Sequence, residues 1–288
     1  MFSVIIPLYN KGESILKTID TVLNQNFKNF ELIIVDDGST DDGLARVRTI
    51  NDGRLKVIHQ NNKGVSSARN AGIRAAKFDW IALLDADDLW DLHHLESFAV
   101  TVENDPEINV ISSGYRVAKK EGTSLSETVV SKEGFYDFFE ISLIHRFVVH
   151  TSSIAFNKTA FSNILFNEQL SKGEDLNFWE QLAKKTPFYL LDNISSSYID
   201  DAENKAVYKS HPLSKTHVFT IDSREITDEK QRKYYINLIL HSVFLVLEKQ
   251  QTLSDALKIY WKHARFIGVK GFYVFARILL NKRSDDKR

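Results

Sequence analysis

The chain of 288 residues carries 37 Lys and Arg against 38 Asp and Glu, and this net charge of −1 argues against general nucleic-acid binding, which normally needs a basic excess. The sequence contains no cysteine, which excludes disulfides, thiolate metal sites and cysteine nucleophiles. Its length suggests one large domain or one domain with an appendage, and its 43% hydrophobic and 26% charged residues are an ordinary globular composition.

Strand and helix signals alternate along the first 115 residues. Short apolar runs predict strands, and apolar residues at helical spacing predict helices. In chain order we expect a strand over 3–8, a helix over 13–23, strands over 30–35 and 55–59, a helix over 65–76, a strand over 80–84, a helix over 92–103 and a strand over 110–113. This alternation predicts an α/β fold with a mostly parallel sheet flanked by helices.

The pattern loosens after residue 114 and then becomes helical. We expect a polar loop or hairpin over 122–134, a strand over 152–156, a helix over 175–184 and a strand over 188–191. From Glu229 the signal is helical to the end, with breaks near Gln250 and Gly268. The sequence therefore predicts a mixed middle part and a helical C-terminal extension.

Neither a leader nor a membrane span is expected. The N-terminus has no basic region and no cleavage site, so we expect a strand and not a signal peptide. No segment reaches the roughly 18 apolar residues of a spanning helix. The nearest, 234–247, is interpreted as a buried helix rather than an interfacial one.

The charge is placed unevenly, because residues 256–288 carry a net +7 and the remainder −8. The aromatic and leucine residues of this tail are Tyr260, Trp261, Phe266, Phe272, Tyr273, Phe275, Leu279 and Leu280, interleaved with Lys258, Lys262, Arg265, Lys270, Arg277, Lys282 and Arg283. Such a mixture suits an interfacial helix on an anionic membrane. The alternative is a pair of helices packed on the rest of the chain with a solvated basic face.

Three acidic clusters carry the chemical signal, since the sequence has neither a GxG fingerprint nor a phosphate loop. Two of them, 36–41 and 85–88, follow predicted strands, where ligands bind in open α/β sheets. The three carboxylates of 85–88 would repel one another unless a cation held them, and hard divalent ions prefer oxygen ligands. The third cluster is Glu174-Asp175. Turns and helix starts remain the alternative interpretation of all three.

Four sequence blocks resemble the family 2 glycosyltransferases of the GT-A fold in order and spacing. They are VIIPLYN at 4–10, VDDGSTD at 35–41, NKGVSSARNAG at 62–72 and LDADD at 84–88. Glu174-Asp175 resembles the family's later catalytic block, and 208–214 resembles its Tyr-Arg-x-His-x-x-Ser segment, with Lys209 in place of the usual Arg. The resemblance covers about residues 1–215, and the helical tail lies outside it.

The resemblance implies a GT-A catalytic domain over 1–220, with a nucleotide-binding half over 1–115 and an acceptor half over 116–220, and a helical extension over 221–288. The implied reaction is the inverting transfer of a sugar from a nucleoside diphosphate donor, expected to be a UDP-sugar. The implied acceptor is a hydroxyl of a glycan or lipid-linked saccharide, and the cofactor a divalent metal, Mn²⁺ or Mg²⁺. The family's usual setting implies a cytoplasmic enzyme of bacterial surface polysaccharide assembly, peripheral on the inner membrane.

On this resemblance, the first two blocks are expected to bind the nucleobase. Pro7, Tyr9 and Asn10 end the first strand and could wall the base, and Tyr9 can stack on it. Glu13 lies one turn further and could reach the base or ribose, or it is an exposed acid. Asp37 can accept a hydrogen bond from uracil N3–H.

The next two blocks are expected to reach the ribose, phosphates and metal. Arg69 and Asn70 could brace the base pocket or the phosphates; the alternative is a surface-facing polar stripe. The resemblance assigns Asp85, with Ala86 beside it, to the nucleotide, where Asp85 contacts the ribose or the metal. It assigns Asp87 to direct metal ligation.

The remaining assignments concern Asp88, the residues expected to act on the acceptor, and one histidine. Asp88 is expected to support its neighbours or cap a helix. His211 is a candidate ligand of the metal or the pyrophosphate. Asp175 is expected to be the general base, with Glu174 contacting the acceptor or supporting the loop; the alternative exchanges these roles and makes Asp175 a helix cap. Trp179, one helical turn on, could form an acceptor platform.

Two other functions compete with the transferase. A nucleotidyltransferase on a similar sheet would need a Gly-rich loop after the first strand, and residues 9–12 hold one glycine. A non-catalytic sugar-nucleotide binder would not need all three acidic blocks. The sequence therefore favours the transferase.

Overall fold

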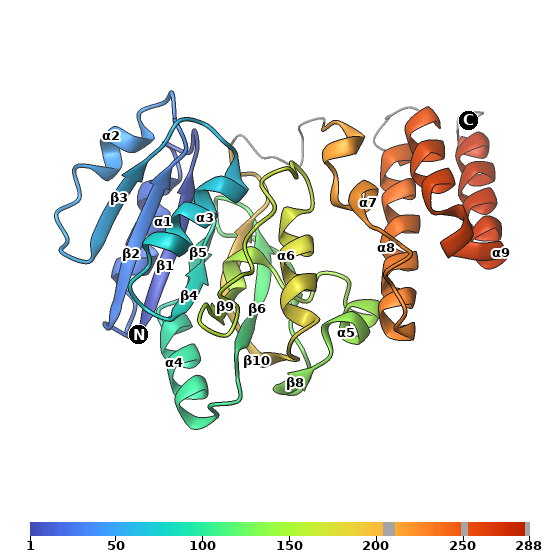
Figure 1. Ribbon diagram of the computed structural model, residues 1–288. Coiled ribbons are helices and arrows are strands. Elements are labelled where there is room, and N and C mark those ends of the chain that lie inside the picture. The colour runs from blue at the N-terminus through green and yellow to red at the C-terminus, as the bar shows by residue number, and fades with distance from the viewer. Residues whose placement is uncertain (204–210, 249–252, 286–288) are drawn as a thin grey trace. The chain divides into compact units, whose positions relative to one another are not determined.

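The apolar runs of the first half form neighbouring strands in the computed structural model, which describes residues 1–203, 211–248 and 253–285 (Figure 1). Contacts divide the chain into two compact units. Unit 1 comprises Met1–Phe138, His145–Glu168 and Glu174–Lys209, and unit 2 comprises Phe139–Ile144, Gln169–Gly173 and Ser210–Arg288. The functional boundary expected at residue 220 stays a prediction.

Unit 1 is built on a ten-stranded sheet with the order β3-β2-β1-β4-β9-β6-β10-β5, in which β7 pairs with β6 and β8 with β10. The strands are β1 (Phe2–Leu8), β2 (Phe30–Asp36), β3 (Leu55–His59), β4 (Trp80–Leu83), β5 (Leu89–Trp90), β6 (Val110–Ala118), β7 (Ser124–Thr128), β8 (Gly134–Tyr136), β9 (Ile154–Asn157) and β10 (Phe188–Ile199). The expected α/β fold is thus confirmed.

The first part of the sheet is parallel. Strand β1 pairs in parallel with β2 and β4, and β2 with β3. All seven residues of β2 are buried, as expected for a strand covered on both faces. Beyond β4 the sheet is mixed, because β9 runs antiparallel between β4 and β6. The carboxyl ends of β1, β2 and β4 therefore meet at one edge, where the first two acidic clusters follow.

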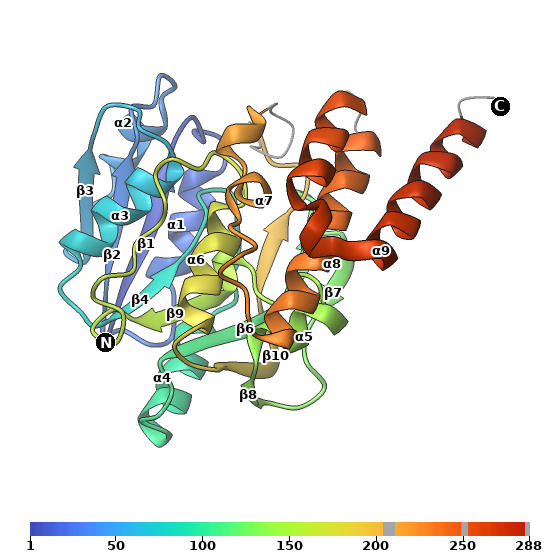
Figure 2. The same ribbon diagram turned by 45° about the vertical axis from the view of Figure 1, so that its right-hand side comes forward.

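Helices cover this sheet. Those of unit 1 are α1 (Ile15–Leu23), α2 (Gly43–Val47), α3 (Val65–Ala75), α4 (His94–Asn104) and α6 (Glu174–Ala183), and α5 (Phe138–Ile144) begins at its border with unit 2. Helix α3 packs on β1 and β2 (Figure 2). This approach needs Gly72, because a Cβ there would overlap the side chain of Ile5. The close packing fixes the middle of α3, which carries Arg69 and Asn70.

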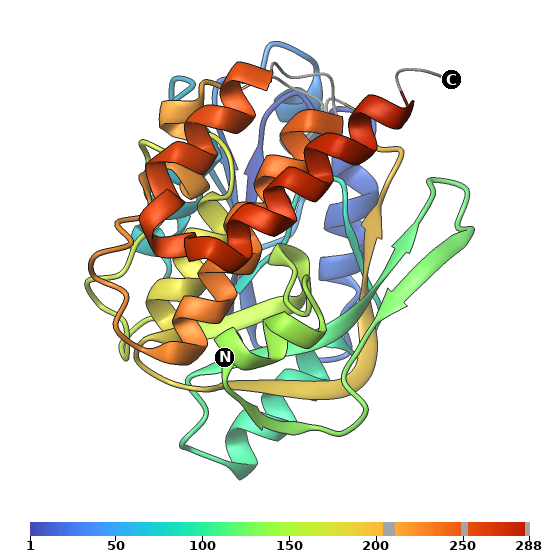
Figure 3. The same cartoon turned by 90° about the vertical axis from the view of Figure 1, so that its right-hand side faces the viewer.

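Unit 2 is helical. Its elements include η3 (Leu213–Lys215), α7 (His217–Thr220), α8 (Glu229–Glu248) and α9 (Leu253–Asp285). Helix α8 packs along α9, which is broken at Gly268, where φ is 69° (Figure 3). The break near Gly268 and the buried helix over 234–247 are confirmed, since Ile239 and Val243 are fully buried. Among the described residues, no helix combines the length and apolar character needed to cross a bilayer.

Some expectations fall outside the described part of the chain. Residues 208–210, with Lys209, are among them, as are the predicted break near Gln250 and the side chains of Lys270, Leu279, Leu280, Lys282 and Arg283. Other elements differ in length from their predictions. Strand β10 runs to Ile199 and not only to residue 191, and β6 continues to Ala118.

Candidate functional site

The loop after β1 is tied to the first acidic cluster. Asn10 has a positive φ of 52°, and its Oδ1 accepts the backbone N–H of Thr40 at 2.7 Å and of Asp41 at 3.3 Å. In return, Asp41 Oδ2 accepts the backbone N–H of Gly12 at 2.7 Å. These bonds bring together the ends of β1 and β2, so two of the predicted nucleotide blocks share one rigid corner.

Asp37 organises the loop that leads into α3. Its side chain is 3% exposed, and Oδ1 accepts bonds from Gln60 Nε2 at 2.7 Å and from the backbone N–H of Lys63 at 2.8 Å. Its Oδ2 accepts the backbone N–H of Gly64 at 2.8 Å. An ionised carboxylate has about four acceptor positions. These three bonds therefore leave Asp37 able to accept one more, and its predicted bond to a base stays a prediction.

Arg69 joins two acidic clusters that are far apart in sequence. It lies on α3 and is 4% exposed. Its Nη2 donates to Asp85 Oδ1 at 2.8 Å, and its Nη1 to Glu174 Oε1 at 3.3 Å. Burial opposes the charge of Arg69, but the two carboxylates outweigh it and raise the pKa of its guanidinium. The residues following β4 and those starting α6 thus meet at one buried cation.

Asn70 holds the segment that leads toward α6. Its Nδ2 donates to the carbonyl of Phe166 and to Glu168 Oε1, both at 2.9 Å, and its Oδ1 accepts the N–H of Phe166 at 2.9 Å. Asn70 is 1% exposed. Because Asn70 and Arg69 are both buried, the alternative of a surface-facing polar stripe is wrong.

Trp179 does not form an acceptor platform. Its side chain is 1% exposed and packs against Phe166 and Phe178, whose rings lie 6.2 and 5.4 Å from it, centroid to centroid. The prediction failed because position 179 falls on the inner face of α6. This aromatic cluster anchors α6 and so fixes the position of its first turn.

Asp85 is the first carboxylate after β4. Its backbone N–H donates to Ser152 Oγ at 3.1 Å, and its side chain pairs with Arg69. Burial acts to raise the pKa of Asp85, but the positive charges of Arg69 and His150 outweigh it and lower that pKa below the ordinary value. Asp85 is therefore held as an anion in a fixed position.

Asp88 is buried beneath the acidic loop and bonds it to neighbouring segments. It is 1% exposed and accepts bonds from Ser152 Oγ at 2.5 Å and from the backbone N–H of Ile199 at 3.0 Å. Burial and the nearby charges of Asp87 and Asp85 raise its pKa well above the usual value. These contacts fit the expected supporting role, because they fasten the acidic loop to β10.

Asp87 is paired with a cation that sequence reasoning missed. Lys11 Nζ lies 2.5 Å from Asp87 Oδ2, and both side chains are 13% exposed. Lys11 also donates to the carbonyl of Glu203, while Ser14 Oγ donates to the carbonyl of Ala86 at 3.0 Å. The only sequence signal for Lys11 was its place in the loop after β1.

The acidic loop over 85–88 supplies some of the oxygen ligands that a hard cation needs, but not a full set. Lys11 shows that Asp87 and a carbonyl oxygen favour a positive charge here, and hard divalent ions prefer the same oxygen ligands. Within the described ranges, no group of three or more His, Cys, Asp or Glu side chains is placed to hold a metal. A divalent ion at Asp87 would thus need further oxygen ligands, such as those of a bound substrate.

Glu174 and Asp175 start α6 directly after Gly173, whose φ of 75° suits glycine. Burial and the charge of Asp175 raise the pKa of Glu174, although Arg69 opposes this. Asp175 Oδ1 accepts the N–H of Leu176 at 2.7 Å. In this pair, Glu174 is therefore held by Arg69, whereas Asp175 is bonded to the first turn of α6.

The other predicted residues lie around this centre or outside it. Pro7 pairs in register with Val35 of β2, and Tyr9 is half-buried. The Glu13 side chain is 74% exposed and lies 3.1 Å from Lys120 Nζ, so it is an exposed acid with a surface partner. His211 belongs to unit 2, and its role as a ligand stays a prediction.

Comparisons with known proteins identify the family. Glycosyl transferase family 2 matches residues 3–165. An uncharacterized glycosyltransferase of Rickettsia felis is 35% identical over 192 residues, which cover 64% of this chain and 30% of the relative. The Escherichia coli UDP-Glc:α-D-GlcNAc-diphosphoundecaprenol β-1,3-glucosyltransferase WfaP is 43% identical over 91 residues, 31% of this chain and 36% of that protein. The chain thus spans about a third of the length of these two curated relatives.

Solved structures agree on the fold. TarS 1–349 of S. aureus in complex with UDP-GlcNAc has a TM-score of 0.69 at 17% identity, over 99% of this chain and 92% of that one. The mannosyltransferase PcManGT from Pyrobaculum calidifontis, in complex with GDP-Man and Mn²⁺, has a TM-score of 0.57 at 16% identity, over 98% and 75% of the two chains. With the family match and the acidic blocks in place, the chain belongs to glycosyl transferase family 2 and has its GT-A fold.

Proposed function

We propose that the protein is an inverting glycosyltransferase that moves a sugar from a UDP-sugar to a hydroxyl of a glycan or lipid-linked acceptor. The observation that carries this proposal is the double pairing of buried Arg69 with Asp85 and Glu174. Family membership supports the reaction class. UDP-GlcNAc in the TarS structure supports the donor class, and the lipid-linked substrate in the name of WfaP supports the acceptor class.

The nucleotide is assigned to the edge formed by β1, β2 and β4. Tyr9 would stack on the base beside Pro7 and Asn10, and Asp37 would use its remaining acceptor position for uracil N3–H. Asp85, with Ala86 beside it, would reach the ribose. The hydrogen bonds that fix this corner before any ligand arrives support the assignment, because preorganised groups lose little entropy on binding.

A divalent metal, Mn²⁺ or Mg²⁺, is assigned to Asp87. When bound, it would neutralise the negative charge that develops on the departing diphosphate. The pairing of Asp87 with Lys11 supports this assignment, because it marks a position that favours a cation. Lys11 would then have to turn away or face the phosphates.

Asp175 is assigned as the general base. In a direct displacement, the acceptor oxygen bonds to the anomeric carbon while the carbon–diphosphate oxygen bond breaks on the opposite face, and the acceptor proton passes to the base. Asp85 and Glu174 are paired with Arg69, and Asp87 with Lys11. Asp175 forms no ion pair in the described part of the chain, so its carboxylate is the least committed of the four.

Donor hydrolysis tests the proposal without knowledge of the acceptor. The protein is incubated with Mn²⁺ and, in turn, UDP-Glc, UDP-GlcNAc, UDP-Gal and GDP-Man, and ¹H NMR follows the released sugar. We expect slow UDP release from one UDP-sugar, with the β anomer formed first. First formation of the α anomer would contradict inversion. Pyrophosphate release from a nucleoside triphosphate would instead indicate a nucleotidyltransferase, and binding without turnover a non-catalytic binder.

A second part of the proposal concerns α9, which we assign to an anionic membrane surface, with the enzyme acting on the cytoplasmic face of the inner membrane. Val269, Phe272 and Tyr273 follow the break at Gly268 and are 73%, 51% and 70% exposed. Exposed aromatic side chains next to basic residues favour the membrane interface.

A further inference from the structure

Unit 2 contains a pocket lined by its own residues alone. Its volume is about 560 Å³, and it is formed by residues 220–224, at and after the end of α7, and by residues 261–263, 265 and 266 of α9. This volume is in the range of small-molecule sites, about 300–1,000 Å³. All of these residues lie beyond the family match, which ends at residue 165, so neither the motifs nor the family assign them a role.

The charged residues of the pocket are mostly basic. Arg224, Lys262 and Arg265 line it, against the single acid Asp222. Asp222 is already neutralised by Arg224, whose Nη2 lies 2.6 Å from Asp222 Oδ2. Glu225, the next residue, adds a negative charge near Arg224 but does not line the pocket. The lining therefore keeps a surplus of positive charge.

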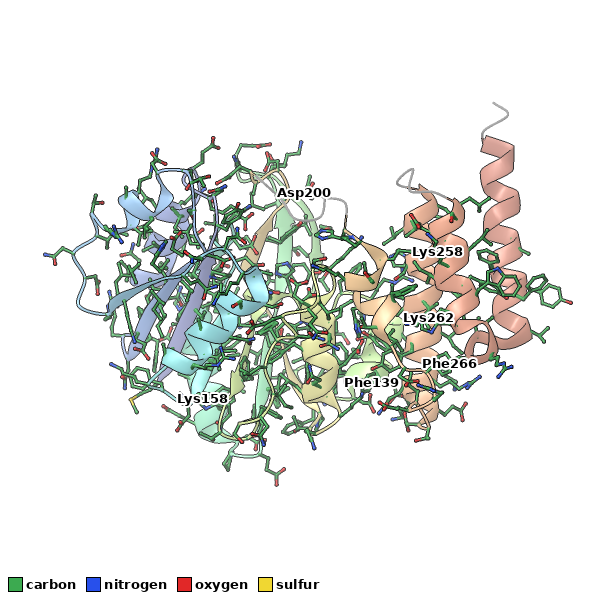
Figure 4. All side chains as sticks on the ribbon, turned by 45° about the horizontal axis from the view of Figure 1, so that its top comes forward. Phe139, Lys158, Asp200, Lys258, Lys262 and Phe266 are labelled. Carbon is green, nitrogen blue, oxygen red and sulfur yellow. The ribbon has the colours of Figure 1, made fainter. Side chains whose placement is uncertain are left out.

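The two cations on α9 differ in their partners. Lys262 donates to the carbonyl of Phe219, and its ammonium lies 4.3 Å from the centroid of the Phe219 ring, which fixes its direction. Arg265 is exposed and has no ion pair among the described residues. Figure 4 shows Lys262 and Phe266 one helical turn apart on α9, with Lys258 one turn earlier. An anion in the pocket would thus meet one fixed and one adaptable cation.

Trp261 gives the pocket an aromatic surface. Its side chain is 67% exposed, although Tyr260 packs edge-on against it with the ring centroids 5.4 Å apart. A large exposed aromatic ring offers a flat apolar face, and the C–H face of a sugar ring packs well on such a surface. An indole beside cations therefore suits a ligand that is both a saccharide and an anion.

His263 adds a polar group in the pocket wall. It is 1% exposed, and its Nε2 lies 2.9 Å from the carbonyl of Val218, so Nε2 carries the proton. Burial lowers the pKa of the imidazole. Its Nδ1 finds no hydrogen-bond partner in the described part of the chain and is left as an acceptor. His263 is therefore a buried part of the wall, and the charge of a ligand is met by Arg265 and Lys262.

We propose that this pocket binds an acidic saccharide, with a sugar ring on Trp261 and its carboxylate at Arg265 and Lys262. The inference rests on the proposed function, because a carboxylate-bearing stretch of the acceptor glycan is the ligand that such a site would hold. It deepens that function by assigning the acceptor a uronic-acid class and a binding site remote in sequence from the acidic blocks.

Calorimetry on the full chain tests the pocket with hexagalacturonate as the acidic probe and maltohexaose as the neutral one. We expect the acidic hexamer alone to bind, more tightly at low salt. Trp261→Ala and Arg265→Ala should each weaken it at least tenfold, and Arg265→Glu should abolish it. Phe135→Ala and Lys258→Ala, an exposed aromatic on β8 and an exposed cation on α9 that both lie outside the lining, should bind as the wild type does.

Several outcomes would overturn the inference. Equal binding of the neutral hexamer would remove the role of the anion, and equal losses in pocket and control variants would remove the site. Inorganic phosphate that competes at the same concentration as the hexamer would show an anion site without saccharide recognition. UDP binding is measured on the same samples. Normal UDP binding without hexamer binding rejects the pocket and leaves the transferase proposal standing.

Discussion

The charged side chains at the candidate sites of the two units differ in their exposure. In unit 1, Arg69, Asp37 and Asp88 are 4%, 3% and 1% exposed, and each is held by several partners. At the pocket of unit 2, the Arg224 side chain is 88% exposed, and Arg265 is exposed as well. Buried charges must be paired because desolvation is expensive, whereas exposed ones gain little from pairing and are screened by salt.

This difference in exposure suits two different functions, a chemical step and the binding of a partner. Buried and mutually paired groups keep one geometry, as a chemical step requires. Exposed cations and aromatic rings can adapt to a partner surface, and the attraction exerted by the cations is screened by salt. We infer that unit 1 is built for the reaction and unit 2 for holding what the reaction acts on, and the following predictions test that division.

The largest effect is expected at the start of α6. Asp175→Asn keeps the shape of the side chain and removes its basicity, so turnover should fall by about 10²–10⁴-fold, the usual contribution of a positioned base. UDP affinity should stay near the wild-type value. Single-turnover transfer and UDP calorimetry measure the two quantities. If Asp175→Asn retains turnover and Glu174→Gln abolishes it, the two roles must be exchanged; if both stay active, this cluster is not catalytic.

The second-largest effect, a loss of folding stability, is expected when the buried cation Arg69 is removed. Arg69→Met leaves Asp85 and Glu174 without their shared partner, and breaking a buried pair in this way typically costs about 3–5 kcal/mol. Arg74→Met on the same helix is the matched control, because its side chain is 58% exposed and its contact with Glu168 is 3.8 Å long. That control should lose less than about 1 kcal/mol. Urea unfolding decides, and equal losses would remove the contrast between buried and exposed charges.

A smaller effect concerns the buried histidine of α4. Burial lowers the pKa of His94 from 6.5 to about 3. Below pH 6.5 the unfolded chain binds a proton that the folded chain does not, so stability falls as the pH drops from 6.5 toward 3. Between pH 7 and 5 this amounts to about 2 kcal/mol.

His94→Gln should remove that part of the pH dependence, even if it lowers stability at pH 7. His93→Gln serves as the control, because the His93 side chain is 71% exposed. Urea unfolding at pH 7 and pH 5 measures both. A wild-type pH slope in His94→Gln would show that His94 is not held neutral by burial.

The smallest effect is expected on the exposed face of α9. Phe272→Ser with Tyr273→Ser should reduce sedimentation with anionic vesicles several-fold, because both aromatic side chains are exposed next to basic residues. Leu125→Ser on β7 is the control, since Leu125 is 50% exposed in unit 1. Equal pelleting of the double variant, the control and the wild type would favour the alternative of a solvated basic face.

The sequence predicted those features that depend on local residue patterns and on the order of the strands. The apolar runs of β1, β2 and β4 identified a sheet edge, and the acidic residues after them marked the candidate site there, because parallel strands end at the same edge. Gly268 identified the break in α9. The sequence predicted only residues 188–191 of β10, because the buried Ser196 and Ser197 are weak strand formers that pair only when β5 and β6 lie beside them.

Long-range partners were beyond sequence reasoning for a physical reason. Lys11 meets Asp87 across 76 residues, and Arg69 meets Glu174 across 105. Neither spacing carries a periodic signal, so only the folded chain reveals the pairs. Trp179 was misinterpreted for a related reason, since the sequence around it could not tell the buried face of α6 from the exposed one.

Calorimetry of UDP binding to wild type and Asp87→Asn, with and without Mn²⁺, tests the central claim that the carboxylates at this sheet edge form the nucleotide and metal site. The account predicts that Mn²⁺ strengthens UDP binding to the wild type, and that Asp87→Asn loses this gain while keeping the metal-free affinity. An undiminished gain from Mn²⁺ in Asp87→Asn would contradict it.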